Sequence, residues 1–169
     1  MRENFRANGD DPAGLPRAYA DLINGALAER PPGMTVTMHT CRGNFRSTWF
    51  AAGGYADDVV QAMFSTRVDA YFMEWDTDRA GGFESLRLLP RDKTVVLGLV
   101  TTKSGRLETG DELKRRIEEA SRHAPIEQLC LSPQCGFSSG IGGNAMTVEE
   151  EIAKLRLVVD TAREVWGSA

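Results

Sequence analysis

The chain has 169 residues, of which 41% are hydrophobic and 26% are charged, a composition typical of one ordinary globular domain. Its formal net charge of -4 argues against a general nucleic-acid binder, which would carry a basic stripe. Because it has neither an apolar run long enough to span a membrane nor an N-terminal signal peptide, we expect a cytoplasmic protein without membrane partners.

The first predicted helix follows residues 1–14, a polar segment that we expect to be loose. Within 15–30, apolar side chains recur at helical spacing, namely at Tyr19, Leu22, Ile23, Ala26 and Leu27. Pro31 then ends the helix. The segment 34–41 is rich in β-branched and apolar residues and therefore predicts a strand.

The alternation of helix and strand continues to the end of the sequence. The further elements predicted, in chain order, are helix 54–66, strand 69–75, helix 83–89, strand 93–102, helix 108–124, strand 127–135 and helix 147–166. Asp111 is a plausible N-cap of helix 108–124, and Thr147 with Glu150 predicts a capping box at the last helix.

Four strands that are apolar on both faces and alternate with helices predict an α/β fold, with a parallel sheet covered by helices. Two architectures fit this pattern: an open doubly wound sheet, or part of a (β/α)8 barrel. Glycine pairs follow several strands, but none has the GxGxxG spacing that would favour the doubly wound sheet.

Side chains able to bind a metal ion lie at the ends of the predicted strands. His39 and Cys41 end the first strand, and because side chains alternate with period two, both point to one face. Glu74 ends the second strand and Cys135 the fourth. Such ends converge in parallel α/β folds, and these four groups suit tetrahedral zinc. Buried cysteines and a salt-bridged glutamate are the equally weighted alternative.

Other polar residues near strand ends are weaker candidates. Lys103 and Ser104 follow the third strand and could act in catalysis, although a solvated lysine is the alternative interpretation. Asn44 lies after the first strand, where Gly43 permits a tight turn beside a metal. Cys130 lies in the middle of a strand and is expected to be a packed core thiol rather than a ligand.

The candidate ligands stand inside four distinctive sequence words. These are MHTCRGNF (38–45), YFMEWDT (71–77), LVTTKSGRLET (99–109) and LSPQCGF (131–137). In their order and spacing they resemble the C-terminal half of the catalytic barrel of the cobalamin-independent methionine synthase family, particularly its short, single-barrel members. The resemblance implies four βα units of a (β/α)8 TIM barrel over 15–169, with zinc bound by His39, Cys41, Glu74 and Cys135.

The resemblance also implies a reaction. In the family, homocysteine sulfur binds zinc and takes the methyl group of polyglutamylated 5-methyltetrahydrofolate, giving methionine. Glu74 is then expected to be an exchanging ligand that makes way for the substrate, and many synthases carry a histidine where this chain has Lys103. The alternatives are alkyl transfer to coenzyme M or a corrinoid partner, a non-catalytic zinc-binding fragment, and a metal-free flavodoxin-like module.

Half a barrel exposes two strand edges and an apolar interior. We therefore expect a homodimer or a second, complementing half-barrel chain, with a truncated gene product as the remaining alternative.

Overall fold

The computed structural model describes residues 2–44, 48–49, 51, 53–138 and 140–169, so that Phe45 of the first sequence word lies outside it. The strands are β1 (Thr37–Thr40), β2 (Ala70–Glu74), β3 (Thr94–Val100) and β4 (Leu129–Pro133). The α-helices are α1 (Arg2–Ala7), α2 (Leu15–Ala26), α3 (Asp57–Phe64), α4 (Gly110–Ser121) and α5 (Val148–Trp166). Short 3₁₀ helices span Asp78–Ala80, Glu84–Leu88 and Ile126–Gln128. Among the residues that the structure describes, no helix is both long and apolar enough to cross a membrane.

The predicted order of helices and strands is confirmed, with differences at the ends of the elements. The segment predicted to be loose contains α1, and the segment 83–89 forms a 3₁₀ helix. Asp111 is not the N-cap of α4. Instead, Thr109 accepts a hydrogen bond from the backbone N–H of Glu112, whose side chain accepts one from the backbone N–H of Thr109. This capping box places the N-cap two residues before the predicted Asp111, and the predicted box at Thr147 is confirmed.

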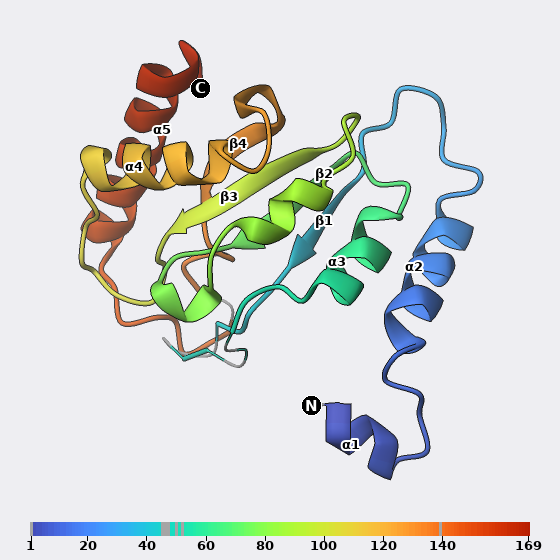
Figure 1. Ribbon diagram of the computed structural model, residues 1–169. Coiled ribbons are helices and arrows are strands. Elements are labelled where there is room, and N and C mark those ends of the chain that lie inside the picture. Colours follow the sequence, from blue (N-terminus) through green and yellow to red (C-terminus); the bar gives the residue numbers. More distant parts are fainter. Residues whose placement is uncertain (1, 45–47, 50, 52, 139) are drawn as a thin grey trace.

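The strands form one parallel sheet in the order β1-β2-β3-β4. This order decides between the two predicted architectures, because a doubly wound sheet has a point at which the strand order reverses. Right-handed crossovers that always step in one direction place their helices on one face. In Figure 1, α3 and α4 lie on the same side of the sheet, with α5 beside α4. The fold is therefore four consecutive βα units of a barrel.

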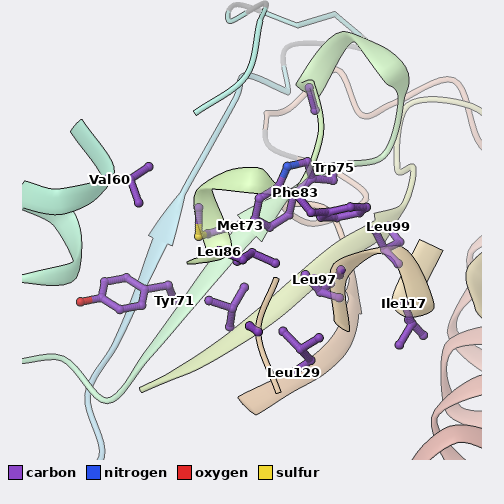
Figure 2. Packing of buried hydrophobic residues seen from close by; sticks show 14 of the residues in the cluster. Val60, Tyr71, Met73, Trp75, Phe83, Leu86, Leu97, Leu99, Ile117 and Leu129 are labelled. Atoms are coloured by element: carbon purple, nitrogen blue, oxygen red, sulfur yellow. The ribbon is translucent and has the colours of Figure 1, made fainter. Parts of the chain in front are cut away.

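The hydrophobic core fills the space between this face of the sheet and the helices (Figure 2). Tyr71 and Met73 of β2 and Leu97 of β3 point into it and are no more than 1% exposed. Burying one such side chain contributes roughly 1.5–3 kcal/mol. Trp75 closes the core where β2 ends, with its ring centre 5.1 Å from that of Phe83. Packing on the helix-covered face of the sheet thus holds the ends of the strands in place.

The opposite face of the sheet is left uncovered by the described helices. His39, Phe72, Val96 and Cys130 are register neighbours across its four strands. His39 and Cys130 are exposed and Phe72 is half-buried. The prediction of a packed core thiol at Cys130 is therefore wrong, because β4 is an edge strand and this residue belongs to the open face. The described helices thus cover only one of the two faces.

Candidate metal centre

The structure brings together the four residues predicted as ligands. One possible ligand atom from each of His39, Cys41, Glu74 and Cys135 lies within 4.8 Å of the corresponding atom of every other. His39 belongs to β1 and Glu74 ends β2, whereas the two cysteines lie in the loops after β1 and β4. The cluster therefore forms at the carboxyl ends of the strands, where functional groups of parallel α/β folds collect.

The separations of the donor atoms fit a tetrahedral zinc ion. The sulfurs of Cys41 and Cys135 are 3.4 Å apart, and His39 Nε2 lies 3.4 Å from Glu74 Oε1. Zinc bonds of about 2.3 Å to sulfur and about 2.0–2.1 Å to nitrogen and oxygen place such pairs about 3.8 Å and about 3.3 Å apart. Both cysteines are free thiols. Small side-chain adjustments would complete the shell, so the residues present fit zinc.

The carboxylate of Glu74 is almost completely buried, at 1% exposure. Its Oε1 accepts the backbone N–H of Cys135 at 3.0 Å, and its Oε2 accepts that of Arg42 at 3.1 Å. Burial opposes ionisation of this carboxyl group, but the hydrogen bonds with His39, Cys135 and Arg42 outweigh it and lower its pKa to about 2. A fixed negative charge is therefore present in the cluster.

This charge changes the neighbouring groups. The hydrogen bond with Glu74 raises the pKa of His39. Burial raises the pKa of the Cys135 thiol, and the adjacent Glu74 reinforces this effect. Both shifts favour the protonated side chains. Metal coordination requires the deprotonated forms, a neutral imidazole and a thiolate, and a bound cation favours these strongly. Metal binding at this cluster would therefore release protons.

Gly43 and Asn44 shape the loop that carries Cys41. Gly43 has a φ of 97°, a conformation that glycine adopts without strain, and its N–H points to the Cys41 sulfur at 3.2 Å. Asn44 is 3% exposed and donates hydrogen bonds of 2.8 Å to the carbonyl oxygens of Cys135 and Gly136. The sequence placed Asn44 near the cluster, whereas its contact with the second thiol loop is visible only in the fold.

The two candidate residues after β3 have different environments. Lys103 is 4% exposed, donates a hydrogen bond of 3.1 Å to Gln134 Oε1, and places its Nζ 5.2 Å from the ring centre of Trp49. The alternative of a solvated lysine is therefore wrong. Ser104 is exposed. Sequence reasoning missed Gln134, although its place directly before Cys135 was an available signal.

A cavity of about 360 Å³ opens on the uncovered face of the sheet next to the cluster. His39, Phe72, Glu74, Ser132 and Cys135 are among the residues that line it. This volume lies within the range of small-molecule sites, about 300–1,000 Å³. A small substrate could therefore reach the candidate ligands from this side.

Fold and cluster together define a β/α-barrel domain with a site that could hold a metal ion. Residues 28–164 match the family model described as "Cobalamin-independent synthase, Catalytic domain". Because the match covers most of the sequence, the chain belongs to this family.

Individual relatives agree with this assignment. The uncharacterized protein YxjH of Bacillus subtilis is 51% identical over 166 residues, which are 98% of this chain and 44% of YxjH. The crystal structure of a putative vitamin-B12 independent methionine synthase from Listeria monocytogenes is similar with a TM-score of 0.68 and 34% identity, over 95% of this chain and 44% of that one. The chain thus spans less than half the length of both.

A named enzyme is a more distant relative. The 5-methyltetrahydropteroyltriglutamate–homocysteine methyltransferase of Bacillus licheniformis is 26% identical over 129 residues, covering 76% of this chain and 15% of the enzyme.

Proposed function

We propose that this chain provides the zinc site of a methyltransferase that moves the methyl group of polyglutamylated 5-methyltetrahydrofolate to the thiol of homocysteine, giving methionine. The observation that carries the proposal is the convergence of four donor groups at zinc-like separations in a chain of this family. The name of the Bacillus licheniformis relative supports this choice of donor and acceptor.

The residues proposed to hold zinc are His39, Cys41, Glu74 and Cys135. Zinc, when bound, supplies the positive charge that keeps a substrate thiol, with an ordinary pKa of about 8.5, in its nucleophilic thiolate form. In the reaction the homocysteine sulfur forms a bond to the methyl carbon as the bond from that carbon to N5 of the folate breaks. The proton lost by the thiol is balanced by the one that N5 gains.

Lys103 is proposed to bind substrate or to handle a proton beside the cluster. Its contact with Gln134 places the ammonium group near the loop of Cys135, in a buried environment where charge acts strongly. Lys103→Met removes the charge and keeps most of the chain length, so zinc content should be retained while methyl transfer falls. Ser104→Ala tests the predicted role of Ser104 separately. Equal turnover of the Lys103 variant and the unmodified protein would remove Lys103 from the proposal.

The uncovered face of the sheet is the basis for a proposed partner. β1 and β4 are the edges of the described sheet, and Ile152, Leu155 and Val159 form an exposed apolar stripe on α5. A closed (β/α)8 barrel has no such edges. We propose that four further βα units, from a second copy or from a complementing half-barrel of the kind the longer relatives contain, pair with the strand edges and pack against this stripe.

Native mass spectrometry combined with metal analysis tests the site and the partner together. We expect one zinc per chain after metal-free purification and readdition, and a complex with either a second copy or a coexpressed complementing half. A folded chain that takes up no zinc contradicts the proposed site. A zinc-loaded complex without methyl transfer from any folate donor would instead indicate a non-catalytic zinc-binding fragment.

The acceptor thiol can be tested without turnover. Zinc X-ray absorption reports an additional sulfur ligand when a substrate thiol binds. We expect this change with homocysteine and not with coenzyme M. The reverse result would indicate an alkyltransferase that acts on another thiol.

A further inference from the structure

The loop that carries Cys135 lies beyond the end of β4, and side chains from other loops hold its backbone. The carbonyl oxygen of Cys135 accepts hydrogen bonds from Asn44 Nδ2 at 2.8 Å and from Thr102 Oγ1 at 3.1 Å. Asn44 Nδ2 also lies 2.8 Å from the carbonyl oxygen of Gly136. One amide group therefore holds two consecutive peptide groups of this loop.

A second amide fixes the orientation of Asn44. The Oδ1 of Asn44 accepts a hydrogen bond of 2.9 Å from Asn144 Nδ2, which also donates to the carbonyl oxygen of Thr102 at 2.7 Å. Because Oδ1 is occupied by a donor, the Nδ2 group must face the carbonyl oxygens of the Cys135 loop. Asn44 and Thr102 are 3% and 0% exposed, so this network is shielded from competing water.

Asn44 connects the two loops that carry the thiols. It lies three residues after Cys41, while Cys135, to which it donates, is 91 residues further along the chain. We propose that Asn44 is a positioning residue that sets the 3.4 Å separation of the Cys41 and Cys135 sulfurs. This inference rests on the proposed zinc site. Mutation of a residue that holds metal ligands in place typically weakens metal binding by about 10- to 100-fold.

Asn44→Ala removes the link, and Asn24→Ala is a matched control. Asn24 also joins two backbone groups, donating to the Ser65 carbonyl oxygen at 3.1 Å and accepting from the Arg67 N–H at 2.6 Å, but it belongs to α2. We expect Asn44→Ala to weaken zinc binding about 10- to 100-fold and Asn24→Ala to leave it within about twofold. Thr102→Val, which removes the other donor to Cys135, should act in the same direction and serves if Asn44→Ala does not fold.

A measurement without zinc separates this inference from the proposed function. Diamide oxidises the two thiols of the metal-free chain to a disulfide and takes up the two electrons and two protons itself, at a rate that depends on sulfur proximity. Peptide mass mapping should show that the Cys41–Cys135 disulfide forms more slowly in Asn44→Ala than in Asn24→Ala. If the unmodified chain binds no zinc but this difference remains, only the zinc proposal fails. If zinc binds and neither zinc affinity nor the oxidation rate changes, the inference is overturned.

Discussion

The backbone N–H of Cys135 donates a hydrogen bond of 3.0 Å to the Glu74 carboxylate, although 61 residues separate the two in the sequence. The other oxygen of the same carboxylate accepts the N–H of Arg42, the residue after Cys41. A single buried group therefore holds both thiol-bearing loops. It organises the candidate site in addition to its proposed role as a ligand.

Glu74→Gln should destabilise the chain even without metal. The amide keeps one acceptor oxygen, but its NH2 group must face the N–H of either Arg42 or Cys135, so one buried donor loses its partner. We expect a loss of about 1–3 kcal/mol in urea unfolding of the metal-free protein, together with weaker zinc binding. Glu164→Gln, at an exposed ion pair with Lys114, should have a much smaller effect, because water and salt screen exposed pairs. Equal stability of the two variants would contradict this role of Glu74.

The three cysteines should respond differently to replacement by serine. Cys41→Ser and Cys135→Ser each remove a sulfur from the cluster and should each lose most bound zinc, because a neutral hydroxyl is a far poorer zinc ligand than a thiolate. Cys130→Ser, on the exposed face of β4, should keep zinc and lose little stability. Zinc per chain, measured by elemental analysis after dialysis, checks all three. Loss of zinc from the Cys130 variant alone would disprove the ligand assignment.

Removal of only one partner of the buried ion pair between Lys154 and Glu108 should destabilise the chain strongly. Lys154 is 0% exposed and its Nζ lies 2.8 Å from Glu108 Oε2, while Glu108 Oε1 accepts the N–H of Thr101. Lys154→Met leaves an uncompensated carboxylate in the interior and should cost about 3–5 kcal/mol.

The double variant Lys154→Met, Glu108→Gln is the control for this pair, because the amide oxygen can still accept the N–H of Thr101. It removes both charges and should recover much of the loss seen by urea unfolding. A double variant no more stable than the single one would show that the effect is lost packing rather than an unpaired charge.

The stabilisation by Asp69 should depend on pH. Hydrogen bonds from the Arg30 guanidinium, joined by the Val36 N–H, lower the pKa of Asp69 below its ordinary 3.8. Because the folded-state pKa is the lower one, this stabilisation is fully present above the ordinary value and is lost as pH falls through the folded-state value. The Tm difference between the unmodified chain and Asp69→Asn should therefore be constant near neutral pH and shrink in acid. A difference that does not change with pH would contradict this assignment.

The sequence predicted the elements well where local physics decides them. Apolar periodicity gave the order of helices and strands, and the Thr147 capping box depends only on residues within one helical turn. At α4 the same rule applied to Thr109, but Asp111 offered a competing N-cap two residues later. The ends of elements are less predictable because neighbouring positions with similar capping ability compete there.

By itself, the sequence determined which residues could bind a metal and that they would follow strands, because strand alternation places His39 and Cys41 on one face. Only the tertiary structure decided that Cys135 approaches Cys41, that Lys103 is buried and that Cys130 is exposed. These facts depend on strand order and register. Contacts between residues far apart in the sequence form only when the whole sheet assembles, and no local pattern encodes them.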